Sequence, residues 1–278
     1  MPTDTIVAPL FPTGLPWVNV VGKQASIIQR GKPLLIEFWD FCRPNSVRTL
    51  PYLQAWHERY AEAGLRIVGV HSPGFEPARD EDAVRAAVAR LGIGYPVLID
   101  RELELWRDYE NQGWPARYLF DGRARLFEYH YGEGAYAETE LAIQELLGVE
   151  REVLDPVRAE DAPDAALAPQ TQDQPGAYSG PYEAGGVWAV LDGSGTVRVS
   201  RAATGGDPGD AGNFDAADLG NPNSPGDRPE GTVVKELTVT HPGAYPLVEH
   251  ERHTTGTLAL EIGPGVQCLA TCFTPGLA

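Results

Sequence analysis

A cysteine stands at the head of a helical pattern in the first fifth of this 278-residue chain. Cys42 precedes Arg43 and Pro44, and proline is favoured in the first turn of a helix. A thiol beside a guanidinium at a helix N-terminus is favoured as the thiolate, the form that attacks disulfides and peroxides. One interpretation of Cys42 is therefore a catalytic monothiol. The other is a small side chain that fills a packed position.

The elements that must position Cys42 alternate between strand and helix. Short apolar runs typical of buried strands lie at 33–40, 65–70, 95–99, 116–121 and 124–131. Helical spacing of apolar residues lies at 50–60, 80–91, 103–109 and 136–147. The order β-α-β-α-β-α-β-β-α predicts an α/β domain whose mixed sheet has helices on both faces.

The second half of the chain has a different composition and residue pattern. Residues 155–182 are rich in Ala, Pro, Asp and Gln and have few large apolar groups, which predicts a linker. We therefore place domains at 1–150 and 183–278, with a linker at 151–182. The last domain shows only short β-rich runs between Gly, Pro and Asp turns, which predicts a small all-β antiparallel sandwich. Its acidic connection, 201–231, matches no calcium-loop spacing and is expected to be solvated.

The segment FWDFCRPNSVRTLPYL at residues 38–53 resembles the active-site segment of the thioredoxin superfamily, in particular the TlpA/DipZ-like (AhpC/TSA-like) redoxins. In that family Phe-Trp precedes Cys-x-x-Cys at the head of a helix, with a proline five residues after the second cysteine. Trp39 and Pro51 align with this pattern without a gap. The alignment puts Arg43 at the first cysteine position and Ser46 at the second, so the Cys-x-x-Cys motif is degenerate.

The resemblance extends beyond this segment. His71 follows the second strand as it does in that subgroup, at the carboxyl edge that hosts ligands in α/β sheets. Trp114-Pro115 occupies the place of the cis-proline that packs beside the family's active site. The C-terminal β-rich region is similar to a sandwich appended in the same subgroup. The resemblance implies a thioredoxin fold followed by that sandwich.

Thiol–disulfide exchange needs an attacking thiolate and a second thiol to resolve the mixed disulfide. Arg43 stays protonated and Ser46 has no thiol, so we expect the family's dithiol chemistry to be lost. The resemblance also assigns Glu37 to the buried acid that lies beneath the cysteines. Arg43 is a candidate ion-pair partner for that acid, with Ser46 close enough to hydrogen-bond. The alternative is a Glu37 whose carboxylate reaches solvent.

The charge of the chain limits its partners. With 39 acidic and 22 basic residues the net charge is −17, which disfavours nucleic acid and anionic membranes. No signal peptide is expected from residues 1–16, and no apolar run is long enough to span a membrane, so we predict a cytoplasmic location. Cys268 and Cys272 are too far apart along one strand for a disulfide, and no histidine–cysteine spacing predicts a metal site or cofactor.

Two functions remain open on the sequence. The domain is a module that binds a protein or an extended peptide between the Arg43 loop and the Trp114-Pro115 turn. Alternatively it is a peroxidase-like enzyme that uses Cys42 alone, or an enzyme whose chemistry is repurposed around Glu37 and His71 with Arg43.

Overall fold

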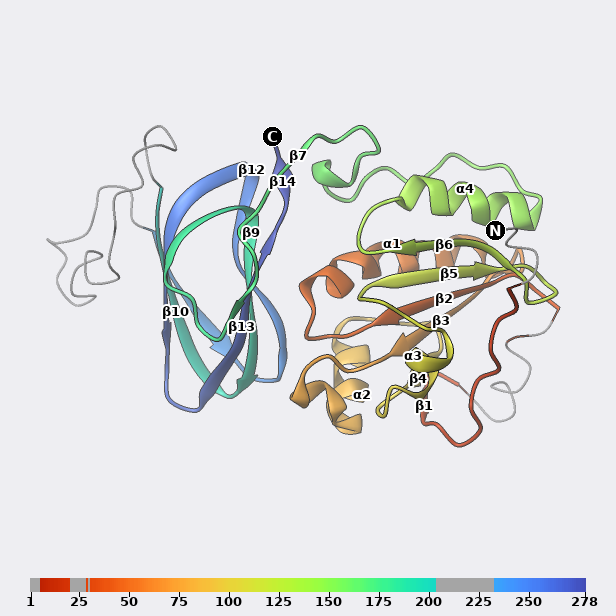
Figure 1. The fold of residues 1–278 in the computed structure, drawn as a ribbon, viewed down its shortest axis with the longest axis horizontal. Helices are drawn as coiled ribbons and strands as arrows, with labels where there is room; N and C mark the ends of the chain where they lie inside the picture. Colours follow the sequence, from red (N-terminus) through yellow and green to blue (C-terminus); the bar gives the residue numbers. More distant parts are fainter. Residues whose placement is uncertain (1–5, 21–28, 30, 204–232) are drawn as a thin grey trace, which may run out of the picture. The chain divides into compact units, whose positions relative to one another are not determined.

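The computed structural model describes residues 6–20, 29, 31–203 and 233–278. The chain forms two compact units, Met1–Pro163 and Asp164–Ala278 (Figure 1). The acidic connection lies outside the described residues from position 204 onward.

The first unit is built on a six-stranded mixed sheet with the order β1-β4-β3-β2-β5-β6 (Figure 1). β2, β3 and β4 are parallel, whereas β1, β5 and β6 run antiparallel to their neighbours. The strands are β1 (Trp17–Val18), β2 (Leu34–Trp39), β3 (Arg66–His71), β4 (Val97–Ile99), β5 (Ala116–Phe120) and β6 (Leu126–Tyr131). The helices are α1 (Pro44–Tyr60), η3 (Glu76–Arg79), α2 (Glu81–Arg90), α3 (Glu104–Asp108) and α4 (Tyr136–Leu147). Every helix and strand predicted from the sequence of this region is present. The sequence analysis missed β1 because a strand of two residues is too short to show a hydrophobic period.

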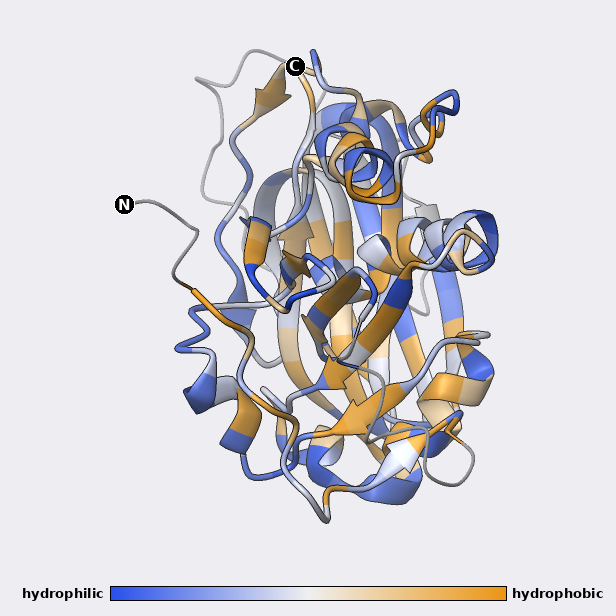
Figure 2. Ribbon diagram, turned by 90° about the vertical axis from the view of Figure 1, so that its right-hand side faces the viewer, coloured by the Kyte–Doolittle hydropathy of each residue, from blue (hydrophilic) through white to orange (hydrophobic). Residues whose placement is uncertain are grey.

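The central strand β2 is buried on both faces of the sheet. Leu34, Ile36 and Phe38 pack into the hydrophobic core on the face that also receives Leu105 of α3. The intervening residues of β2 point to the opposite face because successive side chains of a strand alternate. Orange hydrophobic segments run along the strands, whereas the helices alternate between blue and orange (Figure 2). Glu37 is thus directed into the interior beneath α1 and not toward solvent.

Helix α1 begins where the sequence predicts it. Arg43 is its N-cap residue with an extended backbone, and Pro44 is the first helical residue. Gly64 follows the helix with a φ of +117°, a left-handed conformation that glycine adopts without strain. The buried side of α1 includes Leu50, Leu53 and Trp56.

The second unit is an all-β antiparallel structure. Its main sheet has the order β11-β10-β12-β9-β13-β8, and β14 pairs with β7 in a second small sheet. Its strands are β7 (Leu167–Ala168), β8 (Gln174–Pro175), β9 (Gly180–Gly193), β10 (Gly195–Ala203), β11 (Val233–Val239), β12 (Gly243–Ile262), β13 (Val266–Thr274) and β14 (Gly276–Leu277). The sequence predicts two strands where β12 is continuous, because β12 shifts register against β9 between Glu249 and Thr254.

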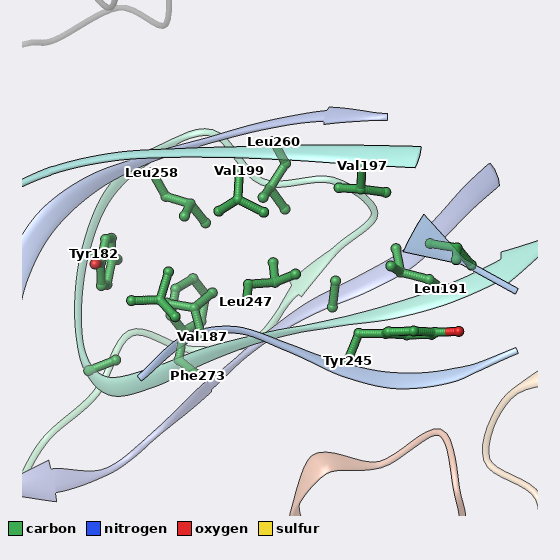
Figure 3. Packing of buried hydrophobic residues seen from close by; sticks show 14 residues of the cluster. Tyr182, Val187, Leu191, Val197, Val199, Tyr245, Leu247, Leu258, Leu260 and Phe273 are labelled. Atoms are coloured by element: carbon green, nitrogen blue, oxygen red, sulfur yellow. The ribbon is translucent and has the colours of Figure 1, made fainter. Parts of the chain in front are cut away.

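The bend of β12 lets one sheet enclose its own core. Figure 3 shows residues of β10 and the second half of β12 facing residues of β9, β13 and the first half of β12. The labelled side chains in this core include Val197, Val199, Leu258 and Leu260 on one side, and Val187, Tyr245, Leu247 and Phe273 on the other. This core is almost entirely apolar, which matches the sandwich expected from the β-rich runs.

The residues after α4 fold back along α1 as a segment that we call the strap, residues 149–163. Tyr52 of α1 donates a hydrogen bond to Asp161, with 2.7 Å between the oxygens. Arg48 of α1 contacts Glu160, with 3.1 Å between Nη2 and Oε1. Polar side chains therefore hold this stretch to the first unit, although its composition alone predicts a linker.

The linker prediction of 151–182 covers residues that the structure divides between the two units. The boundary between the units falls at Pro163 and Asp164. Short elements occupy both sides of it, with η4 (Ala159–Asp161) before the boundary and β7 and β8 after it.

Candidate functional site

The candidate site lies where β2 and β3 end and α1 begins. Cys42 immediately precedes the N-cap residue of α1, and its side chain is fully buried. Its backbone amide donates to Asp40, with 2.8 Å between N and Oδ1. The Cys42 thiol is therefore enclosed by the loop that carries it, which does not favour attack on a large substrate.

Arg43 is held flat against aromatic rings. Its guanidinium carbon lies 4.1 Å from the ring centroid of Trp114 and 5.3 Å from that of Phe75, both within cation–π range. Gly74 lies against the same guanidinium, because a Cβ at this position would come within 2.7 Å of Arg43 Nε. Only glycine leaves room for this stacked arrangement.

Trp114 connects Arg43 to the turn that carries Pro115. The Trp114-Pro115 peptide bond is cis, as expected for the family's cis-proline position. The indole of Trp114 donates to the carbonyl oxygen of Ser72, with a separation of 2.8 Å, and its ring lies 4.1 Å from that of Trp106. Arg43, Trp114 and Pro115, three of the predicted site positions, are thus brought together in one corner of the domain.

Asp40 organises the loop before α1, although no motif in the sequence singles it out. Its second carboxylate oxygen accepts from the amide of Gly74 at 2.7 Å, and its own amide donates to Ser46 Oγ at 3.2 Å. Burial raises the pKa of Asp40 to about 6, although the hydrogen bonds from Cys42 and Gly74 oppose the rise. This carboxylate fixes the chain on both sides of the candidate site.

His71 lies beside Asp40 and is also fully buried. Its Nε2 atom is 3.8 Å from Asp40 Oδ1, and its ring stacks on Phe41 with centroids 5.3 Å apart. Trp39, another predicted site position, packs its edge against the same ring at 5.0 Å. Burial lowers the pKa of His71 to about 3, so the imidazole is neutral at physiological pH.

Asp100 directly follows β4 at the same edge of the sheet and is a second residue that the sequence analysis missed. Its carboxylate accepts hydrogen bonds from Ser72 Oγ at 3.0 Å and from the amides of Leu105 and Trp106 at 3.1 and 2.9 Å. A carboxylate directly before a short helical pattern, as here, is the one sequence signal that could have indicated this role.

Glu37 is the exception among the buried acids. Neither of its carboxylate oxygens has a hydrogen-bond partner among the described residues. Burial raises the pKa of Glu37 to about 8, while the charge of Arg117 lowers it. Glu37 is therefore mostly protonated at neutral pH.

The expected pairing of Glu37 with Arg43 is wrong, and so is the alternative of a solvent-exposed carboxylate. Arg117 is the residue directly opposite Glu37 across β2 and β5. Its guanidinium donates to the carbonyl oxygen of Gly134 and lies over the ring of Tyr136, with 5.0 Å to the centroid. Arg43 cannot serve as the partner because its guanidinium is committed to Trp114 and Phe75.

No protein-family model matches the chain. The protein DipZ of Mycobacterium tuberculosis is 34% identical over 163 residues, which cover 56% of this chain and 24% of DipZ. The thiol-disulfide oxidoreductase YkuV of Bacillus subtilis is 26% identical over 131 residues, covering 47% of this chain and 87% of YkuV. A solved thiol-disulfide isomerase from Corynebacterium glutamicum aligns at 25% identity with a TM-score of 0.45, covering 51% of this chain and 98% of its own.

The first unit has the thioredoxin-like redoxin fold. Its relatives include proteins named as thiol-disulfide oxidoreductases, and the match to DipZ spans about a quarter of that protein's length.

The two remaining cysteines lie outside the redoxin domain. Cys268 and Cys272 both lie on β13 of the other unit. Within the described ranges no group of three His, Cys, Asp or Glu side chains is arranged to hold a metal ion. In the same ranges no helix is both long and apolar enough to cross a membrane.

Proposed function

We propose that the redoxin domain binds an extended protein segment beside Trp114-Pro115 and has lost dithiol–disulfide exchange. The observation that carries this proposal is the position of Arg43. Its guanidinium stands where the first cysteine of the family belongs and is stacked on Trp114.

The loss of exchange chemistry follows from the side chains present at the two positions. Arg43 has no electron pair to offer a disulfide sulfur, because its guanidinium stays protonated. Ser46 is buried, and its hydroxyl accepts the amide of Asp40. No step of a dithiol mechanism can be assigned to this pair.

Binding is supported by what the same corner offers to a partner. Trp114 and Arg43 are both partly exposed, so an aromatic ring and a positive charge border solvent together. The resemblance to redoxins implies that extended substrates lie beside the cis-proline, and removal of the thiols leaves that surface in place. Because the chain has a net charge of −17, we propose a protein partner rather than nucleic acid or an anionic membrane.

The alternative is an enzyme that uses Cys42 as its only thiol. Its location directly before the N-terminus of α1 favours this reading, because the helix dipole stabilises a thiolate there. Complete burial of the side chain opposes it, since a substrate would reach the sulfur only after the loop opens.

Restoring the two thiols tests whether the fold of the domain can still support thiol–disulfide exchange. The wild-type chain should reduce insulin with dithiothreitol no faster than the background. The triple variant Cys42→Thr/Arg43→Cys/Ser46→Cys should exceed it by about 10-fold or more, because it restores both thiols at the helix N-terminus. Insulin reduction by the wild type above background would contradict the loss of exchange.

Binding is tested with an unfolded polypeptide, reduced and carboxymethylated α-lactalbumin, by fluorescence anisotropy. Cys42→Ala should bind as the wild type does, whereas Trp114→Ala should bind about 5-fold more weakly, because the aromatic anchor is removed. If Cys42→Ala lost an activity toward dilute peroxide that the wild type has, the monothiol enzyme would replace the binding module.

A further inference from the structure

The outer strand of the redoxin sheet carries a row of exposed aromatic side chains. Phe127, Tyr129 and Tyr131 lie at alternate positions of β6 and are 37%, 52% and 42% exposed. β6 is the last strand of the sheet and pairs with β5 on one side only. Its other edge therefore presents backbone groups beside an apolar surface.

The open part of this edge has defined ends. At its start, the amide of Leu126 donates to the carbonyl oxygen of Ile6, so the chain's own N-terminal segment covers that point. At its end, Gly132 has a φ of +84° and begins a turn. Between them, residues 127–131 have no strand partner on this side among the described residues.

The backbone of this window is oriented for pairing. The amide of Gly132 donates to Pro115 O, which marks the peptide groups that face β5. Backbone groups of a strand alternate in direction, so those of Tyr129 and Tyr131 point away from β5. These donors and acceptors are available to another strand.

Open edges of this kind are usually protected by short strands, lysines or prolines. The opposite edge of the sheet follows that rule, because β1 has only two residues. β6 has six residues, and its sequence LFEYHY contains neither lysine nor proline. The two edges of one sheet thus differ, and the aromatic edge is the one that a partner would cover.

We propose that the β6 edge pairs antiparallel with β6 of a second copy of this chain, centred on Tyr129. Tyr129 is the midpoint of the window 127–131, so pairing over its whole length places Tyr129 opposite Tyr129 of the second copy. The same register places Phe127 opposite Tyr131, an aromatic pair that stabilises antiparallel strands.

The polar side chains of the window are compatible with this register. Glu128 of each copy lies opposite His130 of the other, so an acid and an imidazole face each other twice across the symmetry axis. Nε2 of His130 contacts the carbonyl oxygen of Glu133 in its own chain at 2.9 Å. Oε2 of Glu128 is buried and has no hydrogen-bond partner among the described residues. A second copy supplies a histidine on the neighbouring strand.

In the proposed dimer, Tyr129 faces Tyr129 of the second copy, which allows a charge-complementation test. The test uses the full chain in sedimentation-velocity ultracentrifugation. The wild type and Tyr129→Phe should sediment with twice the 30.1 kDa mass of one chain. Tyr129→Glu and Tyr129→Lys should each lose the dimer, because like charges would face each other at the axis. An equimolar mixture of the two variants should recover it.

Both charged variants must keep the circular dichroism spectrum and the urea unfolding midpoint of the wild type. We expect this because the Tyr129 side chain is half exposed. A wild-type dimer without recovery in the mixture would overturn the proposal, since pairing would then use another surface or register. A monomeric wild type that dimerises only after removal of residues 1–5 would overturn it in favour of the chain's own N-terminus on this edge. A wild type that stays monomeric at about 0.5 mM in both forms would overturn it outright.

Discussion

Buried acidic side chains in two regions of the redoxin domain differ in how they are hydrogen-bonded. Asp40 and Asp100, at the carboxyl edge of the sheet, accept backbone amides on both of their oxygens. Glu37, beneath α1, is equally buried but has neither oxygen satisfied among the described residues. The distance between the two regions is short, since Glu37 and Asp40 are three positions apart in the chain.

This difference in hydrogen bonding distinguishes carboxylates that hold the fold together from one that does not. A carboxylate that collects several amides fixes a loop, because each amide would otherwise be buried without a partner. A carboxyl without partners contributes little to the fold and is retained at a cost in stability. Asp40 and Asp100 thus build the corner that holds Arg43 and Trp114, whereas no hydrogen bond to Glu37 ties the described residues together.

The largest effect is expected from Asp100→Ala. Removal of this carboxylate leaves the amides of Leu105 and Trp106 without their acceptor, and the free energy of unfolding should fall by about 3 kcal/mol. Urea unfolding followed by tryptophan fluorescence reports on this unit, because every tryptophan except Trp188 belongs to it.

Asp100→Asn is the matched control, since its remaining carbonyl oxygen still accepts one amide and the loss should be smaller. Equal losses in the two variants would mean that charge, and not the hydrogen bonds to α3, is what Asp100 contributes.

A smaller effect with a defined pH dependence is expected from Glu37→Gln. The pKa of Glu37 is raised to about 8 in the fold, so the folded state keeps a proton that the unfolded chain releases near its ordinary pKa of 4.5. Stability of the wild type should therefore decrease as the pH rises through this interval, by about 1–2 kcal/mol between pH 6.5 and 8. Glu37→Gln should remove this slope.

The chosen interval isolates Glu37 from its neighbours. The raised pKa of Asp40, about 6, causes a loss of stability with rising pH only up to that value. The lowered pKa of His71, about 3, causes a loss as the pH falls below 6.5, which has the opposite sign. If the wild type and Glu37→Gln had parallel profiles from pH 6.5 to 8, Glu37 would be ionised in the fold and must have a partner.

The smallest effect is the coupling between Glu37 and Arg43. A double-mutant cycle with Glu37→Gln and Arg43→Ala at pH 8.5 should give a coupling energy below about 0.3 kcal/mol, because the guanidinium stacks on Trp114 instead of contacting the acid. The matched cycle with Arg117→Met should give a larger value, since Arg117 lies opposite Glu37 across the strands. A larger coupling for Arg43 than for Arg117 would restore the ion pair suggested by the sequence.

The sequence is sufficient for the fold of the redoxin domain. The Phe-Trp and proline spacing placed Arg43 and Ser46 at the start of α1, and Trp114-Pro115 before an apolar strand indicated the turn whose peptide bond is cis. The cross-strand neighbour of Glu37 could not be found in this way. Glu37 and Arg117 are eighty positions apart and meet only through the antiparallel register of β2 and β5.

The strap was missed for a different physical reason. Hydrophobic periodicity predicts elements that bury apolar faces, but the strap is held by hydrogen bonds and ion pairs to Arg48 and Tyr52. Polar attachments of this kind leave a composition that is indistinguishable from that of a linker.

The strap also decides where the chain can be divided for separate expression. A recombinant fragment that stops at residue 150 ends before Glu160 and Asp161, and leaves the buried guanidinium of Arg48 with one carboxylate neighbour, Glu133, in place of two. A fragment that continues to Pro163 keeps both attachments and ends at the boundary between the two units. Protease digestion of the intact protein should accordingly release the longer piece, because a cut inside the strap requires α1 to give up its polar contacts first.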